Sequence, residues 1–325
     1  MNRAHFLFLF ISLIFFSCEK KSDHLPRKTT GKINTISVII DDQLWNGEVG
    51  DSIRNKFASP VIGLPQEEPL FTINQYPIKL LEGFMTDNRT IIVLKKGDEN
   101  KFEIMKNQYA SPQNVFHISG KTGADIIKIL EKNAPKIIRL IKKMEIAESQ
   151  RINRQSLLSP KIIANKFNIS LKIPSTYTYV LHKSKFIWLK KEIIGGNTSL
   201  LIYEVPIGSI KKNSNLITSI IKMRDSIGDL YISGTEPKSN MITEEAYAPY
   251  LFKITLDGKK TYETKGTWEL KNDFMAGPFI NYAIVDQENV RILVLEGFCY
   301  APSKEKRDLM HELESIIKSV VVLKN

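Results

Sequence analysis

The sequence predicts an α+β fold made of two modules that are rich in antiparallel sheet, with helices packed against the sheets. In both halves, strand-like segments follow one another in runs instead of alternating one by one with helices, which is typical of this class. A mostly polar stretch at residues 148–160 separates the halves. The chain has 325 residues, of which 42% are apolar, so it can fill more than one core. We therefore expect an N-terminal domain over residues 33–150 and a C-terminal domain over residues 156–325.

The chain opens with a pattern typical of a secretory signal peptide. Arg3 precedes a continuous apolar run at residues 4–16, which is shorter than the roughly 20 residues that a membrane-spanning helix needs. Cys18 follows the small Ser17 directly, and FFSC resembles a loose lipobox, the signature of bacterial lipoproteins. We therefore expect a lipoprotein signal peptide over residues 1–17 and acylation of Cys18, with palmitate among the acyl chains. The alternative is an ordinary signal peptide that contains a cysteine.

A flexible tether is expected between this anchor and the first domain. Residues 18–32 are polar, contain Pro26 and Gly31, and show no apolar periodicity. The residues that directly follow Cys18 include neither an aspartate-led retention signal nor an acidic cluster. This composition favours the outer membrane over the inner one, and the periplasmic face over the cell surface. The membrane, reached through the lipid anchor, is thus one predicted partner.

The first half contains both strands and helices. Strands are expected at residues 33–40, 78–84, 89–95, 101–106 and 114–118. Apolar side chains that recur every four residues predict a helix at residues 47–57. Residues 59–77 contain too many prolines to predict regular structure. A second helical period runs over residues 126–144, and Pro135 is expected to kink or split that helix because it cannot donate an intrahelical hydrogen bond.

The second half repeats this mixture in a regular order. Helices are expected at about residues 157–167, near 214–227, and from an N-cap at Ser303 onward. Strands are expected at residues 169–173, 177–182, 185–193, 199–205, 251–257, 260–270, 281–286 and 291–301. Turn sequences at 257–258 and 286–289 predict hairpins. This order of elements is similar to that of the α/β/α sandwich of PsbP and Mog1 proteins.

Seven blocks of sequence carry a wider resemblance. They are DDQLWNGEVGDSIR (41–54), GLPQEEPLF (63–71), YASPQNV (109–115), RDSIG (224–228), TEEAYAPY (243–250), GTWELKNDFMAGPFINY (266–282) and LEGFCYAPSKEKRDLMHELE (295–314). Together they resemble a family of unknown function found in lipoproteins of Bacteroidota. The resemblance implies an exported, lipid-anchored protein with two globular parts. It implies no activity, cofactor or catalytic residue.

One set of short motifs mimics an enzyme. GDSI at 50–53, GGN at 195–197 and DLMH at 308–311 are similar to blocks of GDSL-type esterases, with Ser52 as nucleophile and His311 as its base. In such enzymes the nucleophile lies between a strand and a helix, whereas Ser52 is predicted inside a helix. His311 is predicted to point away from the apolar stripe of the last helix, into solvent. A GDSL-like hydrolase is therefore the alternative to a non-catalytic role.

Unusual loop compositions indicate candidate binding residues instead. Two tryptophans are either exposed recognition rings or core residues, and a glutamate pair between prolines either is solvated or binds a cation or basic partner. The segment FMAGPF (274–279) either closes the core or forms an apolar binding lip. The candidate partner-binding residues are Trp45, Glu67, Glu68, Trp268, Phe274, Met275, Gly277, Pro278 and Phe279.

Charge and metal-ligand patterns exclude several classes of partner. The net charge of +11 favours anionic neighbours, but no basic stripe with interleaved aromatic residues predicts nucleic-acid binding. No His or Cys spacing predicts a metal site, and no motif predicts a cofactor. In a central strand, Glu296 is expected to form a buried ion pair with an arginine, rather than to act as a catalytic acid, and Cys299 is expected to be a small buried hydrophobe. The leading hypothesis is a lipid-anchored envelope protein that binds or scaffolds an envelope protein or glycan without catalysis.

Overall fold

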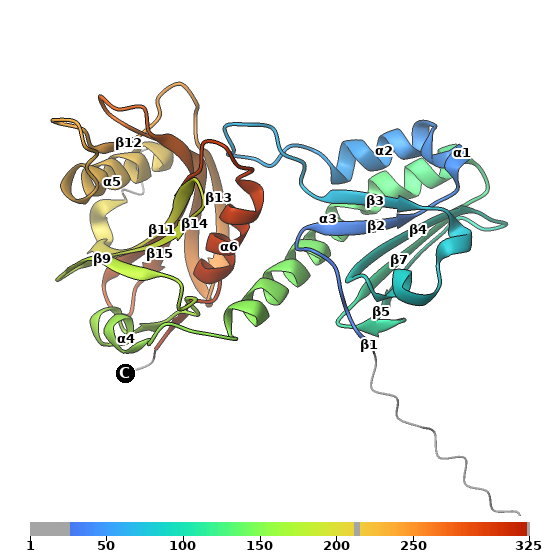
Figure 1. Cartoon of the computed structure of the whole chain (residues 1–325), viewed down its shortest axis with the longest axis horizontal. Helices are drawn as coiled ribbons and strands as arrows, with labels where there is room; N and C mark the ends of the chain where they lie inside the picture. The colour runs from blue at the N-terminus through green and yellow to red at the C-terminus, as the bar shows by residue number, and fades with distance from the viewer. Residues whose placement is uncertain (1–26, 211–214, 324–325) are drawn as a thin grey trace, which may run out of the picture.

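The computed structural model describes residues 27–210 and 215–323, and it confirms the α+β class. The predicted signal peptide, Cys18 and most of the predicted tether lie outside these residues. Two domains lie side by side and share one long helix, α3 (Gly123–Asn153), which packs against both (Figure 1). Among the helices of the described part, none is long and apolar enough to cross a bilayer.

The N-terminal domain contains a five-stranded sheet with the order β3-β2-β4-β7-β5. Its strands are β2 (Thr35–Ile39), β3 (Thr72–Tyr76), β4 (Thr90–Lys96), β5 (Lys101–Lys106) and β7 (Asn114–Gly120). The pairs β2–β3, β2–β4 and β4–β7 are parallel, and β5–β7 is antiparallel. Most strand pairs of this sheet are thus parallel, whereas antiparallel pairing was expected, because two helices and the following loop return the chain to the same end of the sheet after β2.

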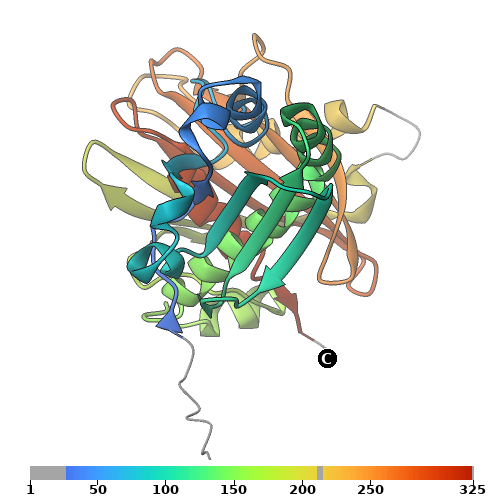
Figure 2. The same cartoon turned by 90° about the vertical axis from the view of Figure 1, so that its right-hand side faces the viewer.

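Three helices belong to this domain. They are α1 (Asp42–Trp45), α2 (Glu48–Phe57) and α3. Side chains of α2 and α3 pack on one face of the sheet in a shared core, and Figure 2 shows the sheet with α3 behind it. Thr122 and Asp125 start α3 with a reciprocal capping box. The helix continues past Pro135, which is exposed, so the predicted split does not occur. It also runs through residues 148–153, where a polar linker was expected.

Two local expectations in this domain are wrong. The Pro-rich stretch contains a regular strand, because the five residues of β3 lie between prolines and include none, and β3 needs to pair only with β2 at the sheet edge. The strand expected at residues 78–84 is replaced by two 3-10 helices, η1 (Ile78–Leu80) and η2 (Gly83–Asp87). Pro77 directly precedes the first of them, and its fixed φ suits a helical turn.

The C-terminal domain is built on an antiparallel sheet with the order β12-β14-β15-β16-β11-β10-β9, and β13 also pairs with β14. Its strands are β9 (Thr178–Lys183), β10 (Phe186–Ile193), β11 (Gly196–Pro206), β12 (Met241–Thr243), β13 (Tyr250–Leu256), β14 (Lys259–Leu270), β15 (Ala276–Asp286) and β16 (Arg291–Tyr300). The helices are α4 (Lys161–Phe167), α5 (Leu216–Tyr231) and α6 (Arg307–Ile317), with η3 (Ile207–Ser209) after β11. A short ribbon joins β8 (Ile169–Ser170) to β17 (Val321–Val322).

Both faces of this sheet are covered by helices. Side chains of α4 and α6 share one core with the sheet, and side chains of α5 share a second core with its other face. This layering is that of an α/β/α sandwich, as the order of elements indicates.

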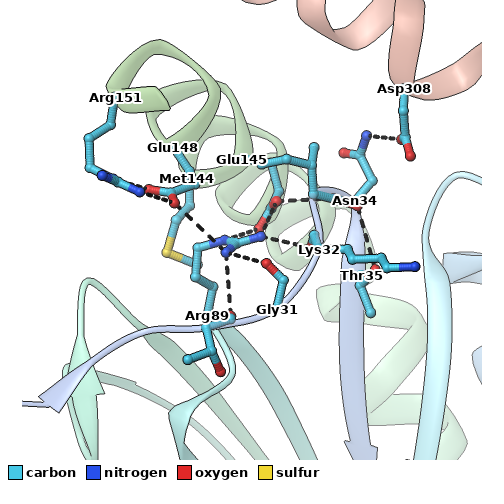
Figure 3. A network of polar contacts seen from close by, with 12 residues as sticks. Gly31, Lys32, Asn34, Thr35, Arg89, Met144, Glu145, Glu148, Arg151 and Asp308 are labelled. Atoms are coloured by element: carbon cyan, nitrogen blue, oxygen red, sulfur yellow. Dashed lines mark hydrogen bonds and ion pairs between the residues drawn. The ribbon is translucent and has the colours of Figure 1, made fainter. Parts of the chain in front are cut away.

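Residues 27–32 are not a flexible tether, although they were predicted to belong to one. Strand β1 (Arg27–Lys28) pairs in parallel with β6 (Ala110–Ser111). The guanidinium of Arg89 then donates to the carbonyls of Thr30, Gly31 and Lys32 at 3.3, 2.8 and 2.7 Å. Its other N–H groups meet the carboxylate of Glu145 on α3, at 3.1 Å to each oxygen (Figure 3). Because both charged groups are buried, the segment is fixed against the domain.

Candidate binding cavity between the domains

Helix α6 is held by the N-terminal domain at its first turn. The backbone amides of Lys306 and Arg307 donate to the two carboxylate oxygens of Glu68 at 2.7 and 2.8 Å. Glu68 lies in the Pro-rich loop of the other domain and is 6% exposed. No side chain at the start of α6 caps the helix, so Glu68 supplies the acceptor for these two backbone amides. The predicted cap at Ser303 is therefore wrong, and Glu68 is a contact between domains rather than a solvated or partner-binding residue.

Further polar contacts join the domains along the same helix. The side-chain amide of Asn34 donates to Asp308 at 2.9 Å, and the guanidinium of Arg307 donates to a carbonyl of the Pro-rich loop at 3.0 Å. Near the other end of α6, the side-chain amide of Gln150 on α3 donates to the carbonyl of Ser315 at 3.0 Å. The two domains therefore meet in a defined geometry.

A cavity of about 510 Å³ opens between these contacts. Residues 61–64 of the Pro-rich loop form one wall, and Pro135, Ile138 and Ile146 on one side of α3 form another. Residues 278–280 of β15 line it from the C-terminal domain. Small-molecule sites have volumes of about 300–1,000 Å³ and mainly apolar walls. The cavity has the size and lining of such a site.

The charged groups of the cavity are mostly positive. Six Lys and Arg side chains line it, against one carboxylate, that of Glu314. Glu314 is already satisfied by Lys318, by the hydroxyl of Tyr282 at 3.2 Å and by Lys265 at 3.8 Å. Burial alone would raise the pKa of Glu314, but Lys265 and then Lys318 hold it well below its usual value. This carboxylate, the only one among the described residues that line the cavity, is therefore ionised and neutralised by protein groups.

His311 lines the same cavity instead of pointing into solvent as predicted. Its Nε2 atom is buried and has no hydrogen-bond partner within residues 27–210 and 215–323. Helix α3 packs against α6, and Glu145 of α3 lies close enough to the His311 ring to act on it electrostatically. Loss of solvent is the main reason why the pKa of His311 is lowered.

The residues of the predicted esterase are not assembled. Ser52 lies within α2 and is 7% exposed, and its hydroxyl has no hydrogen-bond partner in the described part of the chain. It does not line the cavity that contains His311. Asp308, the acidic residue of the motif DLMH, accepts hydrogen bonds from Arg307 and Asn34. No nucleophile, base and orienting acid meet here, as that chemistry requires.

The segment FMAGPF divides into an exposed tip and a buried strand. Residues 271–275 form the turn between β14 and β15, and the ring of Phe274 is fully exposed, at 105% of the reference area. Met275 is half-buried and packs against the C-terminal core. Phe274 is thus the one large side chain of the segment that is open to a partner, and partner binding through it stays a prediction.

The remaining residues of this segment are structural. Gly277, Pro278 and Phe279 lie in β15 and are buried. A Cβ atom on Gly277 would lie 2.1 Å from the carbonyl oxygen of Cys299, so only glycine fits there. The guanidinium of Arg224 lies 3.9 Å from the ring centre of Phe279. These residues close the core, and Pro278 and Phe279 also reach the cavity.

The two tryptophans and Glu67 have different surroundings. Trp268 is 2% exposed and donates from Nε1 to the carbonyl of Cys299 at 3.3 Å, so it is a core residue and not an exposed recognition ring. Trp45 is half-buried beside the N-terminal core, with the guanidinium of Arg54 at 4.6 Å from its ring centre. Glu67 is exposed.

The predicted ion pair of Glu296 is present. Its carboxylate accepts from Arg224 at 2.9 Å and from Asn281 at 2.7 Å, inside the C-terminal domain. Burial raises the pKa of Glu296, and Arg224 opposes that shift. Cys299 belongs to the core as predicted, and burial raises its pKa to about 12. Both residues are structural by their contacts.

Solved structures with a similar arrangement exist at low similarity. A Mog1 point mutant shares 9% identity over 49% of this chain and 92% of its own, with a TM-score of 0.31. The Ran-binding protein Mog1p of Saccharomyces cerevisiae shares 9% identity over 48% and 91%, with a TM-score of 0.32. LpqN of Mycobacterium tuberculosis, described as involved in cell envelope biogenesis, shares 12% identity over 48% and 83%, with a TM-score of 0.30.

Family models match both domains. No curated protein matches the sequence. Residues 29–154 match a domain of unknown function (DUF8532), and residues 156–319 match another (DUF4837). These matches confirm the resemblance to a family of unknown function. Because the second model covers half of the chain, the protein belongs to the DUF4837 family.

Proposed function

We propose that this protein is a non-catalytic binding protein of the cell envelope, which holds a small, largely apolar molecule in the cavity between its domains. A lipid on Cys18 would anchor it, with the outer membrane and its periplasmic face as the location. The sequence FFSC and the apolar run before it support the anchor. The cavity supports the binding role.

The observation that carries the proposal is the apolar lining of an open cavity. Ile62 is 48% exposed in the Pro-rich loop, and Pro135 is exposed on α3 across from it. Water-exposed apolar surface costs free energy, and proteins retain it in contiguous patches mainly where something binds. A ligand that covers both walls would remove this surface from water.

The residue types that line the cavity also support a binding role without catalysis. Within the described residues, no Ser, Thr, Cys or Asp lines the cavity. Its one carboxylate is held by lysines, and its histidine has no nucleophile beside it. A hydrolase needs a nucleophile or an activated water held next to a base.

A pair of matched substitutions tests the binding role. Ile62→Gln places a polar amide in the cavity wall, whereas Ile194→Gln makes the same change at a hairpin residue that is 87% exposed and outside the cavity. Calorimetry with dodecyl maltoside below its micelle concentration should give a negative heat-capacity change for the unsubstituted protein. Ile62→Gln should weaken binding about tenfold, the cost of burying an unpaired amide. If neither this ligand nor another dodecyl amphiphile binds, or if both substitutions weaken binding equally, the proposal is refuted.

A further inference from the structure

We infer that the ligand is an amphiphile with an anionic head group, a phosphate or a carboxylate, and that Arg139, Lys142 and Lys143 on α3 bind this group at the rim of the cavity. This inference rests on the proposed function and adds the chemical class of the ligand.

The three cations lie together and are available. Lys142 and Lys143 follow Arg139 by three and four residues, which places all three on one side of α3. All three are exposed and line the cavity. None has an ion-pair partner in the part of the chain that the structure describes, where Lys265 and Lys318, also in the lining, pair with Glu314. The rim therefore has positive charge that no ion pair among the described residues neutralises.

Acidic residues of the same helix do not compensate these cations. Glu145 faces Arg89, and Glu148 forms an ion pair with Arg151 at 2.7 Å, as Figure 3 shows. The Lys142 side chain is exposed overall, but its place at the cavity wall costs it part of its solvent; this loss first, and then the positive charge of Lys265, lower its pKa. A bound anion would oppose both effects, because it favours the charged form of the lysine.

The arrangement of charge and apolar surface specifies an amphiphile. Pro135, Ile138 and Ile146 line the cavity from the same helix that carries the cations. The wall at residues 61–64 contains no charged side chain. A ligand can therefore place its apolar chain between the walls while its head group stays at the α3 rim. Inorganic phosphate alone would leave the apolar walls uncovered.

A series of ligands that share one chain tests the head group. Dodecyl phosphate, neutral dodecyl maltoside and cationic dodecyltrimethylammonium are titrated into the mature chain carrying Cys18→Ala, with inorganic phosphate as a head group without a chain. Dodecyl phosphate should bind at least about tenfold more tightly than dodecyl maltoside, and salt should reduce this preference. Equal binding of the phosphate and the maltoside would overturn the inference while leaving the proposed function intact. No binding of any dodecyl compound would overturn both.

Matched triple variants locate the head group. The combined change Arg139→Gln, Lys142→Gln and Lys143→Gln should remove the preference for dodecyl phosphate and keep binding of dodecyl maltoside. The control changes Lys128, Lys132 and Lys136 to Gln, which are exposed on the same helix but do not line the cavity; it should keep the preference. An equal effect of both triple variants would contradict the assignment.

Two further arms separate the sources of the anionic group. Inorganic phosphate that binds as tightly as dodecyl phosphate would overturn the amphiphile assignment. Sedimentation with phosphatidylglycerol vesicles that depends on Arg139, Lys142 and Lys143, without binding of monomeric dodecyl phosphate, would also overturn it and assign these cations to a membrane surface instead. Binding of the monomer in solution, with the stated head-group preference, supports the inference.

Discussion

A single carboxylate in the Pro-rich loop links the two domains. Glu67 and Glu68 are adjacent and chemically identical, yet Glu67 is exposed and Glu68 is 6% exposed. Glu68 accepts from the first two backbone amides of the α6 terminus, where the helix dipole also favours a negative charge. Glu68 therefore contributes to stability through its contact with the other domain and not through contacts within its own loop.

The first prediction concerns this pair of glutamates. Glu68→Ala should lower the free energy of unfolding by about 1–3 kcal/mol, because two buried amides lose a charged acceptor. Glu67→Ala is the matched control and should change it by less than about 0.5 kcal/mol. Urea unfolding followed by circular dichroism measures both. Similar values for the two variants would show that the α6 cap contributes nothing to stability.

Glu314 leads to a prediction about pH. Lysines hold its pKa below the ordinary value of 4.5 although burial opposes this. A carboxyl group whose pKa is lower in the folded state contributes stability that is complete above its unfolded pKa and is lost as the pH falls toward the folded one. The stability difference between the unsubstituted protein and Glu314→Gln should therefore shrink from about pH 7 to about pH 3.

A control residue separates this effect from general acid destabilisation. Glu305 is exposed and precedes the same helix. Glu305→Gln should leave the unfolding free energy close to that of the unsubstituted protein at both pH values, within about 0.5 kcal/mol. A difference for Glu314→Gln that stays constant or grows on acidification would contradict the role of the lysines.

At the scale of elements, local patterns predicted the C-terminal sheet well. The strand expected at 260–270 is β14 (Lys259–Leu270), and the one expected at 291–301 is β16 (Arg291–Tyr300). Both strands are joined to β15 by short turns, so these two pairings are between segments close in sequence. Alternating side chains and turn residues are sufficient information for such hairpins.

The N-terminal sheet was less predictable because its pairings are not local. β2 pairs with β3 and with β4, and β4 follows two α-helices, a strand and two 3-10 helices along the chain from β2. Nothing in the pattern of a single strand fixes its direction against a partner so far along the chain. The prolines around β3 also hid a strand whose own five residues are regular.

The cavity could be predicted only in part, for a similar reason. Pro278 and Phe279 belong to the segment FMAGPF, which the sequence indicated as unusual, but the α3 residues were not identified. The apolar residues of α3 form two sets, with Ile137 and Ile141 in the core and Ile138 and others along the cavity. The sequence signal for this was that the apolar residues of α3 cover a wider arc of the helix than a single core-facing stripe needs. The cavity wall formed by the Pro-rich loop could be identified only from the tertiary structure.

At the scale of the whole molecule, α3 connects the N-terminal segment of the described chain to the cavity. Its buried Glu145 binds Arg89, which holds residues 30–32, and also accepts from the backbone amide of Asn34 at 3.0 Å (Figure 3). Asn34 in turn contacts Asp308 on α6 and lines the cavity. The point where the chain enters the fold is thus rigidly connected to both domains.

The last prediction concerns the anchor itself. Cys18→Ala should abolish incorporation of labelled palmitate and should move the protein from the detergent phase to the aqueous phase, since acylation would require the Cys18 thiol. Cys299→Ala is the matched control, because Cys299 is buried and its pKa is raised to about 12, so its thiol is not a reactive site. That control should keep both palmitate and membrane partition, with some loss of stability from the core. Membrane partition of Cys18→Ala with its signal removed would contradict the anchor, and the cationic rim of α3 would then be the first surface to test for membrane contact.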